Sequence, residues 1–340
     1  MRYAITMVVL LLAGVQATPA AGREKVDLHA AEAVIQRDVT QGFSGTVLIA
    51  DGDRIALCKG YGVLHGIPMR AATRYWISSM GKQFVSAAIL KLQDHGKLHL
   101  DDPLAKWFDR TPPDKHSITI RQLLTHTSGL PNGYVGESAS SNSEAVRLLL
   151  AVPLVQEPET GFLYSNENYQ LAAALVERVS GLSFEIFETQ MLFRPLGLRN
   201  IGIANGPSNT APTRDPTPAR LSVPHWGIGG HYASAPDLFH WSRALFGGNV
   251  LSPEGLHELI TPTIKIQEGE AALAWFVNHT AKGTLRLWTR GNDDYGPNSA
   301  IVVYPARGVT MIILTHAGDK AEDLSWSRAV LADLEKALLL

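Results

Sequence analysis

Apolar residues recur at strand spacing toward both ends of the chain and at helical spacing in its middle. After a predicted first helix over residues 26–40, two β-rich runs at 45–50 and 54–58 flank an Asp-Gly turn and predict a hairpin. Strands are also predicted near the C-terminus, at residues 272–279, 285–289, 299–304 and 309–315, before an amphipathic helix over 321–338. Strands at both ends of a chain predict one antiparallel sheet built from both termini.

The middle of the chain consists of predicted helices and loops. Helices are expected at residues 79–95, 120–125, 143–151, 169–179, 236–245 and 253–260, with a long loop rich in Pro, Thr and Asn over 203–224. We therefore expect an α+β fold, in which helices flank the antiparallel sheet and a mostly helical lobe is inserted. The expected domain is a single one over residues 23–340, with an α/β lobe (about 23–78 and 265–340) and a helical lobe (about 79–264). A functional site is expected in the cleft between these lobes.

The first 22 residues have the order of a secretory signal peptide. Arg2 precedes an apolar run over residues 4–15, and small residues follow up to Gly22. The run is too short to span a bilayer comfortably, although an uncleaved membrane anchor is the alternative. We expect cleavage between about Ala17 and Gly22, a periplasmic or secreted mature protein, and no stable membrane span after cleavage.

The composition of the chain argues against nucleic acid, a disulfide and a metal site, but it does not indicate a function. The 340 residues are 45% hydrophobic, enough for a large core, and the formal net charge of −2 gives no electrostatic reason to expect nucleic acid as a partner. Cys58 is the single cysteine, so an intrachain disulfide is excluded. The histidines, among them His225, His231 and His240, lack metal-ligand spacing, and no metal is expected. The oligomeric state is left open.

Ser79 and Lys82 form a Ser-x-x-Lys pattern at the start of a predicted helix. At this spacing Lys82 lies on the same helix face as Ser79, one turn on. A serine oxygen is a poor nucleophile until a nearby base takes its proton, and a desolvated lysine can be that base. The pattern is a signature of covalent catalysis, but it is short enough to occur by chance. The alternative is a capping serine followed by a solvated lysine.

Two further segments could complete such a site. Tyr164-Ser165-Asn166 follows a loop and precedes a predicted helix, so that a phenol could relay a proton and an amide could orient a substrate carbonyl. The segment 288–296 connects two β-rich runs. There, Arg290 could hold an anionic substrate group, and a backbone N–H could complete an oxyanion hole with that of Ser79. Each segment alone is typical of an ordinary polar loop.

Taken in order, these segments resemble the serine β-lactamase and penicillin-binding-protein superfamily, in particular its class C β-lactamase-like branch of esterases and D-aminopeptidases. The resemblance runs from about Gly42 to Gly318, and the order of six segments is far more specific than any one of them. The matching segments are Trp76-Ile77-Ser78-Ser79-Met80-Gly81-Lys82-Gln83-Phe84, Gly96-Lys97-Leu98-His99-Leu100-Asp101-Asp102-Pro103, Leu123-Leu124-Thr125-His126-Thr127-Ser128-Gly129-Leu130-Pro131, Tyr164-Ser165-Asn166-Glu167-Asn168-Tyr169, Arg194-Pro195-Leu196-Gly197-Leu198 and Gly229-Gly230-His231-Tyr232-Ala233-Ser234-Ala235-Pro236-Asp237-Leu238.

The resemblance implies a role for each residue that matches a family motif. Ser79 matches the acylated nucleophile, and Lys82 matches the partner that activates it. Tyr164 matches the proton relay, and Asn166 matches an amide that orients the substrate. The backbone N–H of Ser79 and that of a residue on the later strand would hold the oxyanion. The resemblance implies no metal and no organic cofactor.

The chain departs from the family pattern at the third motif, which begins with Lys or His, continues with Thr or another small residue and ends with Gly. Alignment without gaps places Arg290, Gly291 and Asn292 there, whereas one inserted residue gives Thr289, Arg290 and Gly291. We prefer the ungapped version because it keeps a cation at the first place. In both versions the hydroxyl that helps bind the carboxylate of β-lactams is missing or displaced, and Asp293 and the aspartate after it add negative charge. β-Lactam hydrolysis is therefore not expected to be the main activity, and cationic or neutral substrates are expected over anionic ones.

The leading hypothesis is an exported serine hydrolase that forms an acyl-enzyme with an ester or a D-amino-acid-containing amide or peptide. One alternative is a D-alanyl-D-alanine carboxypeptidase or weak class C-type β-lactamase. Another is a binding module for penicillin or wall peptide that does not turn over. The expected partner is a small-molecule ester, peptide or lactam. His126 and Ser128 invite a rival Ser-His site, which we reject because the chain has no Gly-x-Ser-x-Gly elbow and the segment is typical of a structural turn.

Overall fold

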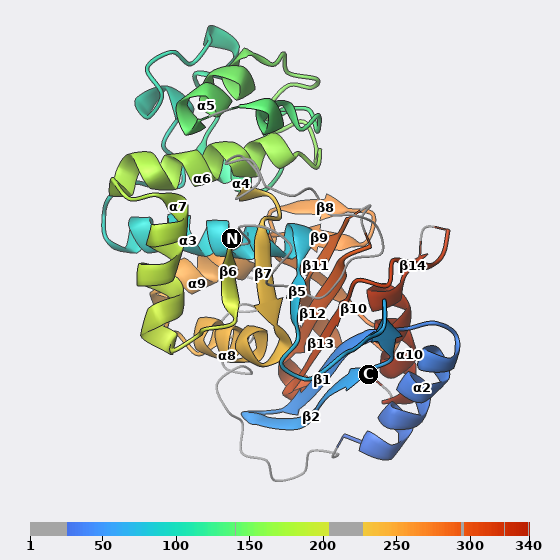
Figure 1. Ribbon diagram of the computed structural model, residues 1–340. Helices are drawn as coiled ribbons and strands as arrows, with labels where there is room; N and C mark the ends of the chain where they lie inside the picture. The colour runs from blue at the N-terminus through green and yellow to red at the C-terminus, as the bar shows by residue number, and fades with distance from the viewer. Residues whose placement is uncertain (1–25, 140, 204–226, 294–295, 323, 339) are drawn as a thin grey trace.

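One long antiparallel sheet joins the two ends of the chain (Figure 1). The computed structural model describes residues 26–139, 141–203, 227–293, 296–322, 324–338 and 340. The strand order in the sheet is β2-β1-β13-β12-β11-β10-β9-β8. Gly45 in β1 lies opposite Thr315 in β13, so the prediction of a sheet built from both termini is confirmed. The strands are β1 (Gly45–Asp51), β2 (Arg54–Tyr61), β8 (Ile264–Ile266), β9 (Gly269–Ala271), β10 (Phe276–His279), β11 (Leu285–Asn292), β12 (Asn298–Tyr304) and β13 (Val309–Thr315).

The central strands are apolar on both sides because the sheet separates two hydrophobic cores. In β13, Met311 and Ile313 belong to one core, while Ile312 and Leu314 belong to the other. This is the alternation that a pleated strand imposes on successive side chains. Every residue of β13 is buried, so the strand is covered on both faces.

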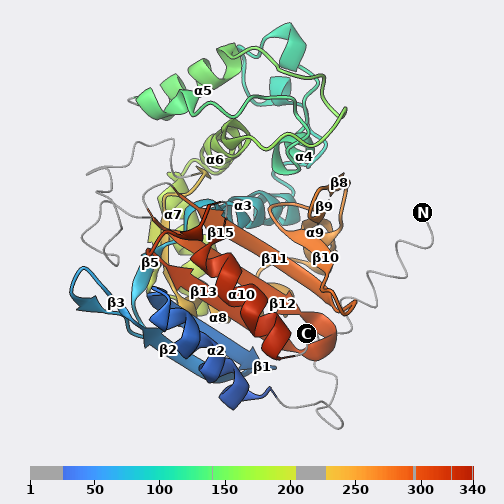
Figure 2. The same cartoon turned by 90° about the vertical axis from the view of Figure 1, so that its right-hand side faces the viewer.

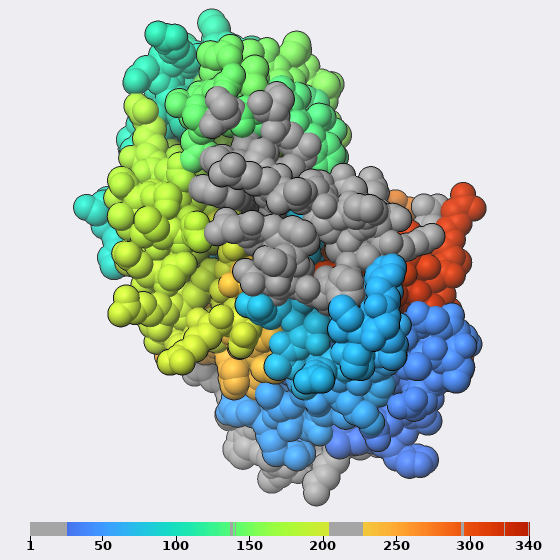
Figure 3. Space-filling model, in the orientation of Figure 1, coloured from blue at the N-terminus to red at the C-terminus, as the bar shows by residue number. Residues whose placement is uncertain are grey.

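Helices supply the two covering layers. α2 (Leu28–Thr40) and α10 (Trp326–Ala337) pack on one face (Figure 2), and the remaining helices lie on the other side of the sheet. The space-filling view shows the green helical part as one end of the molecule (Figure 3). The predicted α+β fold, an antiparallel sheet with a mostly helical insertion, is confirmed. The inserted helices are α3 (Lys82–Asp94), α4 (Ile120–Leu124), α5 (Asn142–Ala151), α6 (Asn166–Ser180), α7 (Phe184–Glu188), α8 (Ala235–Phe246) and α9 (Pro253–Ile260).

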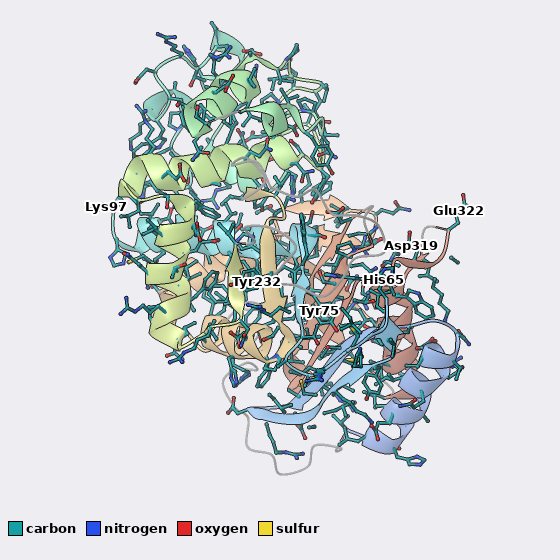
Figure 4. All side chains as sticks on the ribbon, in the orientation of Figure 1. His65, Tyr75, Lys97, Tyr232, Asp319 and Glu322 are labelled. Carbon is teal, nitrogen blue, oxygen red and sulfur yellow. The ribbon has the colours of Figure 1, made fainter. Side chains whose placement is uncertain are left out.

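A second, three-stranded sheet takes two of its strands, β6 and β7, from the segment that we predicted to be mostly helical. Its order is β5 (Arg74–Trp76), β7 (His231–Ser234) and β6 (Ile201–Ile203). Figure 4 labels Tyr75 and Tyr232, which come from the adjacent strands β5 and β7. β6 and β7 are three and four residues long, too short to show a period of two, which is why the sequence pattern did not predict them.

Helix α6 begins at Asn166, earlier than the predicted start at Tyr169. Ser165 caps the helix, because its hydroxyl accepts a hydrogen bond from the N–H of Asn168 at 3.4 Å. Asn166 is therefore the first residue of the helix and not part of the preceding loop. The cap fixes the direction of the Asn166 side chain, which matters for the site described below.

The C-terminal helix begins at Trp326, five residues later than predicted. A two-stranded hairpin of β14 (Asp319–Ala321) and β15 (Leu324–Ser325) occupies the intervening residues. The predicted signal peptide at 1–22 and residues 204–224 of the predicted loop lie outside the described residues, so both stay predictions.

Candidate active site

Ser79 lies in a 3₁₀ turn, Ser78–Gly81, that runs directly into α3. The helix predicted over 79–95 is present, but its first turn is tighter than an α-helical turn. Lys82 Nζ is 3.0 Å from Ser79 Oγ, so the Ser-x-x-Lys spacing brings the two groups together. The alternative of a solvated lysine is wrong, because Lys82 is only 3% exposed. Ser79 itself is partly exposed, as a nucleophile must be.

The amine of Lys82 is held by three oxygens. Nζ donates to Asn166 Oδ1 and to the carbonyl of Ile228, each at 2.8 Å, and it faces Ser79 Oγ. Burial lowers the pKa of Lys82 well below its usual value, while the charge of Glu167 acts in the opposite direction. Burial therefore favours the neutral form of Lys82, and the three contacts fix the position of its amine.

Tyr164 donates from its hydroxyl to Ser79 Oγ at 2.8 Å. Burial raises the pKa of Tyr164 to about 12, although its bond to Ser79 and the charge of Arg290 oppose that shift. The ring stacks on His126, with centroids 4.5 Å apart. His126 Nδ1 accepts from the N–H of Ser165 at 3.1 Å, and burial lowers the pKa of His126 well below its usual value. A neutral phenol thus lies on a neutral imidazole beside the nucleophile.

His126 and Ser128 do not form a Ser-His pair. Ser128 is fully buried, and its hydroxyl donates to Asn168 Oδ1 at 2.5 Å. His126 is engaged with the backbone of Ser165. The segment is a turn that supports Tyr164 and the start of α6, as the sequence predicted.

The turn that carries Ser79 is fixed by both sheets. The N–H of Ile77 donates to the carbonyl of His231 in β7 at 3.0 Å, and Ser299 in β12 donates from Oγ to the carbonyl of Ile77 at 2.8 Å. Ser78 has φ of 50°, a left-handed conformation in which glycine carries no steric cost. Glycine would therefore fit this position, directly before Ser79, without strain.

The backbone of Gly291, in β11, lies directly beside the backbone of Ile77 and Ser79. A Cβ at this position would lie 2.1 Å from the carbonyl oxygen of Ile77 and 2.9 Å from the nitrogen of Ser79. Side chains cannot approach so closely, so the position requires glycine. The predicted connecting loop is in fact strand here, because β11 continues to Asn292. Gly291 is therefore brought to Ser79, as predicted, on an extended backbone.

Arg290 does not contact the trio of Ser79, Lys82 and Tyr164 through a hydrogen bond. Its guanidinium forms a two-point ion pair with Glu268, at 2.8 and 3.1 Å, and lies 4.9 Å from the centre of the Trp288 ring. Strand alternation places Arg290 and Gly291 on opposite faces of β11. The cation that we predicted for an anionic substrate group is thus already paired within the protein.

The last two predicted binding residues lie at the end of β11. Asn292 is exposed and is the final residue of the strand, opposite Asn298 in β12. Asp293 is half-buried, and its N–H donates to the carbonyl of Pro297 at 2.9 Å, which closes the turn between the strands. The aspartate after it lies outside the described residues.

The comparison with known proteins decides the family. The family profile described as Beta-lactamase matches residues 31–334, which is most of the chain. The chain belongs to the beta-lactamase family. Penicillin-binding protein 4* of Bacillus subtilis (strain 168) is 26% identical over 337 residues, covering 87% of this chain and 72% of that protein. Together with the site geometry, this membership supports assignment as a serine hydrolase.

The relatives and the solved structures that resemble this chain differ in length and in identity. Protein flp of Staphylococcus aureus (strain N315) is 26% identical over 318 residues, covering 83% of this chain and 62% of that protein. Across the first curated relatives the chain spans 59% to 72% of their length. The D-amino acid amidase from Ochrobactrum anthropi SV3, solved with L-phenylalanine amide, has a TM-score of 0.78 at 18% identity, covering 92% of this chain and 98% of that one. That likeness shows the shared fold.

Two buried carboxylates near the family's catalytic positions were missed by the sequence analysis. Glu167 is the second residue of α6 and is fully buried. Glu188 pairs with His231 Nε2 at 2.9 Å, with both side chains at most 1% exposed, and burial raises the pKa of Glu188. His231 is thus a core histidine, as expected for a histidine without metal-ligand spacing. No local pattern marks either glutamate, because their burial depends on distant segments.

Two kinds of feature are absent from the described residues, metal sites and membrane-spanning helices. Within them, no group of three or more His, Cys, Asp or Glu side chains is arranged to hold a metal ion. No helix in the described part of the chain is long and apolar enough to cross a membrane.

Proposed function

We propose that this protein hydrolyses D-amino-acid amides or esters that lack a carboxylate near the scissile bond, through an acyl-enzyme on Ser79. The observation that carries the proposal is the arrangement of Lys82 and Tyr164, which both contact the same serine oxygen, at 3.0 and 2.8 Å. Two proton-handling groups on one partly exposed hydroxyl fit acyl transfer.

The contacts of Lys82 support its role as the base. Two of its bonds go to carbonyl oxygens, those of Asn166 and Ile228, which can only accept hydrogen bonds. A neutral amine has two N–H groups and one lone pair. If the N–H groups bind the two carbonyls, the lone pair points to Ser79. Ser79 Oγ would then form a bond to the acyl carbon as its proton passes to Lys82 Nζ.

Tyr164 is suited to deliver that proton to the leaving group. Its raised pKa, about 12, keeps the phenol protonated at neutral pH, so it can donate its proton to the leaving group, and the proton that Lys82 took from Ser79 then restores the phenol. The C–N or C–O bond of the substrate breaks as the leaving amine or alcohol takes the proton. Water then attacks the ester of Ser79 by the same route in reverse and releases the acid.

The oxyanion hole would use the N–H of Ser79 and one from the 290–292 segment of β11. The support is the approach of Gly291, whose Cα faces the nitrogen of Ser79. Because Gly291 is the position that must be glycine, it is the better match for the glycine of the family's third motif. We therefore revise the preferred alignment to the one with an inserted residue, in which Thr289 takes the place of the cation.

The substrate class follows from charges on β11. Thr289 is uncharged and buried, and Arg290 forms a two-point ion pair with Glu268, which also lies 3.5 Å from Arg328. An arginine whose two-point site is already filled cannot bind a substrate carboxylate in the same way without losing that pair. This favours substrates with an uncharged leaving group. The amidase of Ochrobactrum anthropi, which shares the fold, motivates the choice of D-amino-acid amides.

A substrate panel with a Ser79→Ala variant tests the proposal. The panel contains p-nitrophenyl esters, D- and L-amino-acid p-nitroanilides and D-alanyl-D-alanine. The wild type should turn over a neutral ester or D-amino-acid anilide, and Ser79→Ala should lose all measurable turnover, since the nucleophile itself is gone. Sustained turnover also separates a hydrolase from a binding module that only acylates once. Activity that survives in Ser79→Ala would refute the proposal.

A penicillin-acylated carboxypeptidase is the second candidate, and the Arg290–Glu268 pair counts against it. We expect Glu268→Gln to free Arg290, which could then bind the carboxylate of a penicillin. The rate of acylation by a fluorescent penicillin should rise by up to about tenfold, the contribution of one charge-assisted hydrogen bond. Hydrolysis of neutral esters should stay within about twofold. Glu270→Gln, which removes a charge from the neighbouring strand β9, is the control. If the wild type already prefers penicillin over neutral substrates, the second candidate is the correct one.

A further inference from the structure

Glu167 is a fully buried carboxylate that the proposed chemistry does not use. Its Oε1 accepts from the N–H of Gly133 at 2.8 Å and from the N–H of Val135 at 3.1 Å. Its Oε2 lies 3.3 Å from the hydroxyl of Ser165, whose proton has a closer acceptor in the carbonyl of Pro131 at 2.6 Å. None of the ion pairs among the described residues includes Glu167. Burying a carboxylate with neutral partners alone is costly, which suggests that the charge has a use.

The position of Glu167 links it to the base. It follows Asn166, the residue that accepts a hydrogen bond from Lys82, and it lies in the first turn of α6. The free N–H groups of a helix start favour a negative charge there. The same turn is tied to the 131–135 loop, because the N–H of Asn166 donates to Asn132 Oδ1 at 3.0 Å.

The charged and titratable groups that face Lys82 come from several elements. Tyr164, before α6, and Tyr169, within it, place their rings 5.1 and 5.7 Å from Nζ. His126, after α4, is neutral. On the other side of Gly81, His231 is paired with Glu188. Among the described residues, Glu167 is the acidic group whose negative charge acts on Lys82.

We propose that Glu167 is a positioning residue that tunes the proton affinity of Lys82 and ties the 133–135 loop to the helix that carries Asn166. The expected effect of Glu167 on kcat/KM rests on the proposed function. The buried charge favours the protonated amine and so makes Lys82 a stronger base than its dry surroundings alone would allow. The two N–H bonds hold the loop on either side of Tyr134, which has φ of 55°.

The direct test is an NMR titration of Lys82 in protein with ¹³C-labelled lysine, the signal being assigned by its loss in Lys82→Met. In Glu167→Gln the amide can still accept both loop N–H groups, but the charge is gone. Removing a negative charge disfavours the protonated amine, so the titration of Lys82 should move to lower pH, by on the order of one unit. An unchanged titration would overturn the proposal. Glu157→Gln, which removes an exposed glutamate from the same part of the chain, should leave the titration unchanged.

Kinetics provide the second readout. The acidic limb of the kcat/KM profile should move to lower pH in Glu167→Gln, and the plateau should fall because Lys82 becomes a weaker base. Glu167→Asp keeps the charge, but its shorter side chain cannot reach the N–H groups of the 133–135 loop as well. The acidic limb of its kcat/KM profile should therefore stay near that of the wild type, while its melting temperature should fall. A uniform loss of activity without a shift in Glu167→Gln would mean a structural role only and would contradict the proposal. A shifted NMR titration in an enzyme that never acylates Ser79 would retain this inference and refute the proposed function.

Discussion

Replacing Lys82 with methionine should lower kcat/KM for the preferred ester or amide by about 10³-fold, within the range for loss of a positioned general base. Methionine fills nearly the same volume but cannot take the proton of Ser79. The variant also leaves Asn166 Oδ1 and the carbonyl of Ile228 without their donor. Each unmet acceptor costs about 1–3 kcal/mol, partly offset because a buried amine no longer has to be desolvated. The measurement is kcat/KM, together with a thermal melt that confirms folding.

Lys91→Met is the matched control for that substitution. Lys91 lies on the same helix, α3, and its Nζ also donates to a backbone carbonyl, that of Val250 at 2.8 Å. It should lose a similar interaction without loss of activity. If Lys82→Met retains more than a tenth of the wild-type kcat/KM while remaining folded, Lys82 is not the base.

A single methyl group at Gly291 should disable the site. In Gly291→Ala the new Cβ would lie 2.1 Å from the carbonyl oxygen of Ile77, so β11 or the Ser79 turn must move. Displacing one oxyanion donor typically costs about 10²- to 10³-fold in kcat, and the overpacking should cost about 1–3 kcal/mol of stability. The expected result is therefore a large fall in kcat with a modest fall in melting temperature.

Gly161→Ala tests whether the effect is specific to that approach. Gly161 lies in the loop before Tyr164, and a Cβ there meets nothing within 4 Å. This variant should keep nearly full activity. Equal losses in Gly161→Ala and Gly291→Ala would show that the protein is merely sensitive to changes near the cleft and would remove the argument for a close backbone approach.

Local sequence was sufficient for the parts of the site that depend on short-range geometry. The three-residue spacing of Ser79 and Lys82 is enough to bring them within 3.0 Å, because helical turns place such residues on one face. The central strands β1, β12 and β13 were predictable because they are seven residues long and almost entirely buried. The order of motifs placed Tyr164 near Ser79 and Asn166 near Lys82, although each of these contacts spans more than eighty residues of chain.

What the sequence did not predict depends on contacts between distant segments. Arg290 was expected to bind substrate, but Glu268, 22 residues earlier, pairs with it across a hairpin that had been predicted only in part. Glu167 follows a recognised motif, yet nothing nearby in sequence shows that two N–H groups from residues 133 and 135 meet its carboxylate. A glutamate in the first turn of a helix is typically exposed, so the sequence pattern favoured an exposed side chain, whereas Glu167 is buried.

The central claim is that Ser79 becomes acylated, and mapping a covalent adduct tests it most directly. The wild type and Ser79→Ala are treated with a fluorophosphonate, and the tryptic peptide 75–82, which contains both Ser78 and Ser79, is fragmented by mass spectrometry. One adduct per wild-type chain is expected, on Ser79, and none in Ser79→Ala. An adduct on Ser78, on Ser128 or at equal yield in the Ser79→Ala protein would contradict it.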